Sequence, residues 1–177
     1  DEEERVKEAV ERLLRDLERA IKESEDHLRR LNEDLDRVIR ESKEHLKKVN
    51  DDVRRAGVDK RLLDELKKST EDNKKTADDL KRKLKRSTDE NKKRLKRLEE
   101  ELRRLVERLK EALRDNISEE LLKKLLEELK RLIERIKRDL KRTNDEHEKL
   151  IREIKKRLED SNRDHERLVK DIKETAR

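Results

Sequence analysis

The chain reads ESEDHLRRLN over residues 23–32 and ESKEHLKKVN over residues 41–50, so a ten-residue motif returns after 18 positions. Eighteen residues complete five turns of an α-helix at 3.6 residues per turn, so each side chain comes back to the same side of the helix. A heptad repeat drifts around the helix and causes supercoiling, whereas this period involves no drift. The motif therefore predicts a long and nearly straight helix.

The same period occurs in two later parts of the chain. Ser-Thr-x-x-Asn stands at 69–73 and at 87–91, and Ser/Thr-Asn-x-x-His stands at 143–147 and at 161–165. From Val10 onward, apolar or small residues recur at alternating steps of three and four, which is typical of the packing face of a helix. We therefore expect an all-α protein with an 18-residue layer repeat.

The composition is unusual for a globular protein. Of the 177 residues, 59% are charged and 28% are hydrophobic, and Phe, Trp, Tyr, Met, Cys and Pro are absent. High charge with few apolar residues is typical of disordered chains, but the periodic spacing favours long helices instead. We interpret the chain as a designed sequence. Without a targeting or membrane-spanning segment, it is expected to be soluble and to be made in a cytoplasmic expression host.

Two short segments contain residues that end one helix and begin the next. Gly57, the single glycine, suits a left-handed position after a helix, and Asp59 suits the N-cap of the following helix. Asn116 and Ser118 repeat this arrangement. Short loops between helices of similar length predict an up-down-up antiparallel three-helix bundle, in one domain spanning residues 1–177. The expected helices span about 2–55, 59–115 and 118–176.

The uncharged polar residues are predicted to form two layers across the bundle. Folding the chain about Gly57 places Ser42 near Asn73, and folding it about Asn116 places Asn73 near Ser161. One further step of the repeat in each helix leads to apolar residues, so the polar layers occupy core positions of the repeat. The first layer comprises Ser24, His27, Ser87, Thr88, Asn91, Thr143 and His147. The second comprises Ser42, His45, Ser69, Thr70, Asn73, Ser161 and His165.

Four further asparagines lie at the edge of the apolar faces. They are Asn32, Asn50, Asn144 and Asn162. The spacing leaves open whether they belong to the layers or to the boundary of the core.

With layers of Ser, Thr, Asn and His, Asp or Ser caps, and Lys/Glu/Arg surfaces, the whole chain resembles the de novo designed parametric helical bundles with modular buried hydrogen-bond networks. The resemblance names a class and no particular member. It implies one of three uses: a scaffold, a dimerisation module or a pH-driven switch.

The layers suggest two roles. A buried polar side chain costs free energy unless it is paired, so layers that match in one register disfavour every other register. The four histidines suggest acid-triggered destabilisation, because an imidazolium adds a charge and can no longer accept a hydrogen bond. Burial of each histidine would lower its pKa, so stability would be lost as the pH falls.

Other functions find less support in the residues. Two histidines in a layer lack a third strong ligand, so we expect no metal and no cofactor. The pairs Ser24–His27 and Ser42–His45 lack an orienting acid and an oxyanion hole, so we expect no enzyme activity. The 55 basic residues are interleaved with 49 acidic ones and no aromatic residue is present, so specific nucleic-acid binding is not indicated. Nor do we expect membrane binding, because the apolar faces are needed for the core.

Two alternatives to a closed monomer stay open, although no partner is required. The chain could be the three-helix part of a four-helix bundle that binds a designed helical partner. It could also self-associate as the subunit of a homo-oligomer or of a pH-responsive filament.

Overall fold

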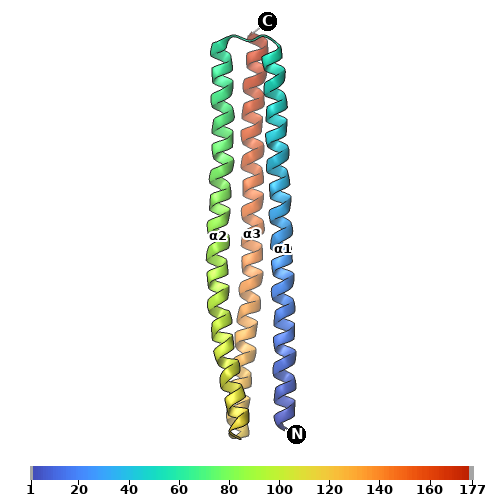
Figure 1. Ribbon diagram of the computed structural model, residues 1–177, viewed down its shortest axis with the longest axis vertical. Coiled ribbons are helices and arrows are strands. Elements are labelled where there is room, and N and C mark those ends of the chain that lie inside the picture. The colour runs from blue at the N-terminus through green and yellow to red at the C-terminus, as the bar shows by residue number, and fades with distance from the viewer. Residues whose placement is uncertain (1, 176–177) are drawn as a thin grey trace. The chain divides into compact units, whose positions relative to one another are not determined.

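The computed structural model describes residues 2–175, which form three helices and no strand. Helix α1 spans Glu2–Arg55, α2 spans Lys60–Arg114 and α3 spans Glu119–Thr175 (Figure 1). The all-α three-helix architecture is thereby confirmed. The expected starts at 59 and 118 each lie one residue early, because these two residues are caps. The end expected at 176 lies outside the described residues.

The loop between α2 and α3 ends one helix with a Schellman-type turn. Asn116 has a positive φ of 50°, and the Ile117 amide donates to the Ala112 carbonyl at 3.3 Å. The Ser118 hydroxyl then accepts from the amide of Leu121 at 3.4 Å, as an N-cap does. Ile117 and Leu122 both pack into the same apolar cluster, which fits the hydrophobic staple.

The loop between α1 and α2 uses its glycine for the same purpose. Gly57 has a φ of 70°, and its amide donates to the carbonyl of Arg54 at 3.3 Å. The carbonyl of Asp59 accepts from the amides of Leu62 and Leu63, each at 3.1 Å, and so opens the first turn of α2. A left-handed residue is therefore placed at each of the two turns.

The chain divides into two compact units, and all three helices contribute to both. Unit 1 comprises the residues up to Arg29 together with Ser87–Glu146. Unit 2 comprises Arg30–Arg86 together with the residues from His147 onward.

Unit 1 contains one large apolar cluster. It draws on all three helices and includes Leu17 of α1, Leu109 of α2, and Leu129 and Ile136 of α3, each 2% exposed or less. Ion pairs join Arg94 to Asp139, Glu101 to Arg135 and Arg108 to Glu128. Because the α3 number falls as the α2 number rises, these two helices are antiparallel in unit 1.

Unit 2 contains two apolar clusters with polar residues around them. One cluster is built around Leu35 and Ile154, and the other, near the first loop, is built around Val53 and Leu66. The hydrogen-bonded pairs between α1 and α3 are Asp34–Lys155, Ser42–Asn162 and Asn50–His165. The pairs between α2 and α3 are Ser69–His165 and Asn73–Ser161. In the α1–α3 pairs both residue numbers rise together, so these two helices are parallel. In the α2–α3 pairs one number rises as the other falls, so these two helices are antiparallel. The order in unit 2 is therefore up-down-up.

Candidate functional site

The candidate site consists of uncharged polar side chains in the cores of the two units. Six polar residues are 7% exposed or less: Ser24, Asn50, Asn73, Thr143, His147 and His165. Among the described residues, no buried side-chain nitrogen or oxygen lacks a hydrogen-bond partner. These cores therefore accommodate polar groups without leaving any of them unpaired.

The most complete network surrounds His165 of α3, whose side chain is 1% exposed. Its Nδ1 lies 2.8 Å from the hydroxyl of Ser69, and its Nε2 lies 2.8 Å from Oδ1 of Asn50. The amide nitrogen of Asn50 donates to the hydroxyl of Thr70 at 2.9 Å, and that hydroxyl reaches the Leu66 carbonyl at 2.9 Å. Four side chains from three helices thus form one continuous chain of hydrogen bonds.

Each bond in this network has a defined direction. The carbonyl of Leu66 can only accept, so the hydroxyl of Thr70 donates to it and accepts from Asn50. The amide oxygen of Asn50 then faces His165, whose Nε2 must carry the proton. A neutral His165 consequently accepts at Nδ1 from the hydroxyl of Ser69. When the imidazole of His165 is neutral, the network therefore requires the tautomer that carries its proton on Nε2.

A second network in unit 2 surrounds Asn162 of α3. The hydroxyl of Ser42 lies 3.0 Å from its Oδ1 and 2.8 Å from its Nδ2, so it contacts both ends of the amide. Nδ2 of Asn73 donates to the hydroxyl of Ser161 at 2.7 Å and to Oδ1 of Asn162 at 3.1 Å. This network also joins all three helices.

In unit 1, an arginine replaces part of the expected network. Ser24 donates to Oδ1 of Asn144 at 2.8 Å, in the same way as Ser42 and Asn162 interact one repeat later. Nη2 of Arg94, however, donates both to Oδ1 of Asn91 at 3.1 Å and to the hydroxyl of Thr143 at 3.0 Å.

The guanidinium of Arg94 also has a nearly buried counterion. Its Nε lies 3.0 Å from the carboxylate of Asp139, whose side chain is 10% exposed. Arg94 was not predicted to belong to a polar layer, although it departs visibly from the repeat. The equivalent position one repeat earlier is Thr76, whose hydroxyl bonds to the Asp72 carbonyl of its own helix.

The remaining residues of the first predicted layer are divided between the units. In unit 2, Nε2 of His147 lies 2.8 Å from Oδ1 of Asn32, and His147 is 2% exposed. In unit 1, Ser87, Thr88 and His27 are half-buried.

His45 departs from the expectation of a core residue. Its side chain is 52% exposed, and its Nε2 lies 2.5 Å from a carboxylate oxygen of Glu166. The prediction that His45 belongs to the buried layer is therefore wrong. The next residue, Leu46, is 4% exposed and takes the inward position, so His45 points about 100° away from it around the helix.

The four asparagines left open by the sequence all take part in the networks. Asn50 and Asn162 connect helices within the two unit 2 networks, while Asn32 binds His147 and Asn144 binds Ser24. Their amide groups, which both donate and accept, bond to a polar group of another helix. The motifs that end in Asn could have identified them, because Asn32 and Asn50 stand at the same position of the repeat.

No family model matches the chain, and neither a curated protein nor a solved structure is significantly similar to it. None of the helices within residues 2–175 is both long and apolar enough to cross a membrane. Within the same residues, no group of three or more His, Cys, Asp or Glu side chains is placed to hold a metal ion.

Burial lowers the pKa of His165 below its ordinary value of 6.5, while the neighbouring Glu166 carboxylate opposes that shift. The direction follows from the cost of placing a charge in the core. The lowered pKa favours the neutral ring, in which Nδ1 accepts from the hydroxyl of Ser69.

A matched pair of substitutions tests the energetic role of the His165 network. Thr70→Val keeps the shape of the side chain but leaves the amide of Asn50 without its acceptor, so we expect the free energy of unfolding to fall by about 1–3 kcal/mol. Thr76→Val, in the same helix, removes an exposed hydrogen bond of a hydroxyl group. This substitution should change the free energy of unfolding by less than about 0.5 kcal/mol. Urea unfolding of both variants measures the difference. Equal effects would contradict the role assigned to Thr70.

Proposed function

We propose that the chain is a designed structural scaffold without a natural biochemical activity, and that its buried hydrogen-bond networks fix the register of its helices. The observation that carries this proposal is the His165 network. It takes Asn50 from α1, Ser69 and Thr70 from α2, and His165 from α3. One set of bonds therefore depends on the axial position of all three helices.

The alternatives to this register are costly. Sliding one helix by a turn moves its side chains by about 5.4 Å, which is more than a hydrogen bond can span. The amide of Asn50 and the ring of His165 would then be buried without partners, at about 1–3 kcal/mol for each group. Leucine-type layers at these positions would pack almost equally well after such a slip, because apolar contacts are not directional.

The sequence itself supports a designed origin. The chain uses a restricted set of residue types, and the same polar motifs return at one fixed period in each helix. A repeat of whole turns gives every layer the same geometry, so a hydrogen-bond pattern that fits once fits again at the next repeat. This modularity favours deliberate placement of the polar residues.

We also propose that acid weakens the scaffold through His165. Protonation gives the ring two donors, so Nδ1 can no longer accept from Ser69, and it places a positive charge in a core site. His45 is not part of this proposal, because its side chain is 52% exposed and lies outside the core. Acid sensitivity is therefore assigned to the buried network and not to all four histidines.

The register role is tested by making apolar both unit 2 networks that join the three helices. Asn50→Leu, Ser69→Ala, Thr70→Val and His165→Leu are combined with Ser42→Ala, Asn73→Leu, Ser161→Ala and Asn162→Leu, because removing all partners together leaves no polar group unpaired. We expect this variant to be about as stable as the parent but to populate more than one register.

Spin labels on cysteines at Arg40 and Asp160 report the register, since these exposed sites lie on α1 and α3 of unit 2 with the same offset as Ser42 and Asn162. The parent should give one narrow distance distribution by pulsed electron–electron resonance. The apolar variant should give a broadened distribution or additional distances. A single narrow distance distribution in both proteins would show that the networks do not fix the register of the helices.

The acid response has a defined sign. Because the pKa of His165 is lower in the folded protein, the unfolded chain takes up the proton first. The contribution to stability is complete above about pH 6.5 and is lost as the pH falls towards the folded-state pKa. We expect the urea midpoint to fall between pH 7.5 and 5.5, to fall less in His165→Asn, and to fall at least as much in His45→Asn. An equal fall of the urea midpoint in the parent and in His165→Asn would exclude His165 as the source of the acid sensitivity.

A further inference from the structure

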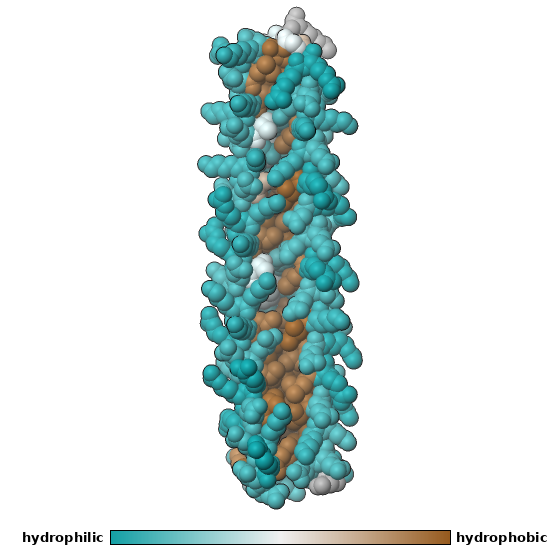
Figure 2. Space-filling model, viewed as in Figure 1, coloured by the Kyte–Doolittle hydropathy of each residue, from teal (hydrophilic) through white to brown (hydrophobic). Residues whose placement is uncertain are grey.

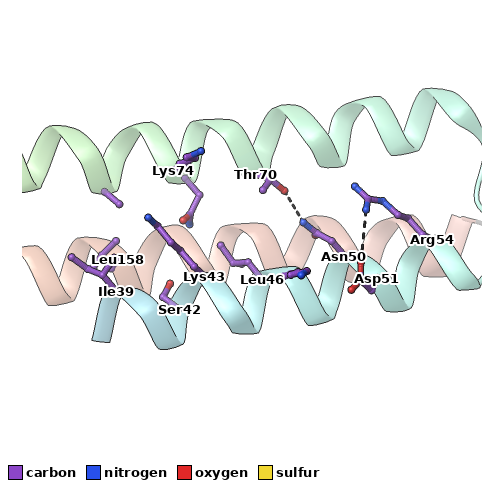
Figure 3. A pocket seen from close by; sticks show the side chains of 13 residues that line it. Ile39, Ser42, Lys43, Leu46, Asn50, Asp51, Arg54, Thr70, Lys74 and Leu158 are labelled. Carbon is purple, nitrogen blue, oxygen red and sulfur yellow. Dashed lines mark hydrogen bonds and ion pairs between the residues drawn. The ribbon is translucent and has the colours of Figure 1, made fainter. Parts of the chain in front are cut away.

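A groove of about 400 Å³ lies between α1 and α2 in unit 2, with α3 behind it (Figure 3). Its walls include Ile39 and Leu46 of α1 and Ala77 of α2, and Leu158 of α3 contributes to its floor. The lining runs from Ile39 to Arg54 along α1, which is roughly 22 Å at 1.5 Å per residue. A compact ligand would fill only part of such a groove, whereas a helix would follow its length.

The same groove position recurs in unit 1, where a second groove of about 400 Å³ lies between α1 and α2. Lys7 and Val10 line it at the positions two repeats before Lys43 and Leu46. On α2, Lys110 stands two repeats after Lys74. Residues at equivalent positions of the repeat thus line both grooves. The groove between α1 and α2 is therefore a regular feature of the sequence and not a local packing defect.

Helix α1 buries fewer apolar side chains than α3 does. Helix α3 contributes eleven buried apolar side chains, whereas α1 contributes six. In unit 2, Leu31 and Val49 of α1 are half-buried but do not line the groove, and they pack into the same apolar clusters as Leu150 and Leu168 of α3. The space-filling view shows apolar surface between the charged side chains (Figure 2). Some apolar surface is therefore visible between α1 and α2, the two helices that flank the groove (Figures 1 and 2).

The polar residues that line the groove would tolerate being covered. Asn50 and Thr70 bond to each other, Asn73 bonds to Ser161, and Ser42 bonds to Asn162. Because each has a partner inside the bundle, an apolar side chain placed over it need not leave it unpaired.

The rim of the groove determines the charge of the occupant. Of the lining side chains, Lys43, Lys47, Arg54 and Lys74 are basic and Asp51 alone is acidic. Lysine stems are flexible and can swing outward while their ammonium groups stay in water. A second copy of this face would bring like charges together, whereas acidic residues beside an apolar stripe would meet opposite charges.

We propose that the α1–α2 groove of unit 2 binds an amphipathic helix whose apolar stripe is flanked by Asp or Glu. The apolar stripe packs on Ile39, Leu46 and Ala77, and the acidic flanks pair with the lysines of the rim. This is the helix-in-groove mode of recognition, with the partner as the fourth helix of the bundle. The groove shares Asn50 and Thr70 with the His165 network, whereas the apolar and basic residues that contact the partner lie outside that network.

Two helical peptides test the proposal against the full chain. Both contain four heptads with Leu at the two core positions, and they differ only in having Glu or Lys at the flanking positions. We expect the Glu peptide to bind at least tenfold more tightly than the Lys peptide in fluorescence anisotropy at low salt, with the preference shrinking as salt is added. Methyl resonances of Ile39, Leu46 and Ala77 should shift on binding.

A charge reversal at the rim provides the decisive variant. Lys43→Glu, Lys47→Glu and Lys74→Glu are combined at exposed positions, so the fold should be retained, as circular dichroism and urea unfolding verify. We expect this variant to prefer the Lys peptide. The matched control reverses three exposed lysines that do not line the groove, Lys48, Lys156 and Lys170, and should keep the preference for the Glu peptide within about twofold.

Several results would overturn the proposal. These are equal affinity for both peptides, an unchanged preference in the rim variant, or methyl shifts confined to residues outside the groove. Self-association of the parent that the rim reversal abolishes, without binding of either peptide, would assign the face to a second copy of the chain.

Discussion

The structure depends on one constraint: a polar side chain buried in the core must find a partner. The constraint is most demanding at His165, where both ring nitrogens lie 2.8 Å from a polar atom of a different helix. Since the Leu66 carbonyl can only accept, the bonds from Thr70 through Asn50 to Nε2 of His165 have fixed directions. Apolar packing holds the three helices together, and this chain of bonds makes a single arrangement of them favourable.

The repeat places similar side chains in both units, but it does not give them the same bonds. Ser24–Asn144 and Ser42–Asn162 are equivalent pairs, and they interact in the same way. Asn73 donates to Ser161, whereas the equivalent Asn91 and Thr143 both accept from Arg94. One departure from the repeat, an arginine where the earlier position has Thr76, is enough to change the network around it. A long side chain with several donors can reach acceptors that a hydroxyl cannot.

The sequence predicted the features that follow from local geometry. The periodicity indicated three helices, and Gly57 and Asn116, which tolerate positive φ, marked the ends of two of them. Folding about Asn116 brought Asn73 near Ser161, and these residues are hydrogen-bonded. The sequence was less informative about which polar side chains meet across the helices. The asparagines bridge helices from the edge of the apolar faces, and Arg94 enters a polar site. His45 lies outside the core because Leu46 is the residue that points inward.

The central claim is tested most directly by the protonation state of His165. Long-range proton–nitrogen correlation spectra of the ¹⁵N-labelled protein at pH 7.5 distinguish the two tautomers and the imidazolium. The account predicts a neutral ring with the proton held on Nε2, and an Nδ1 that accepts a hydrogen bond. A His165 that exchanges rapidly between tautomers, as an exposed histidine does, or that is already protonated at this pH would contradict it.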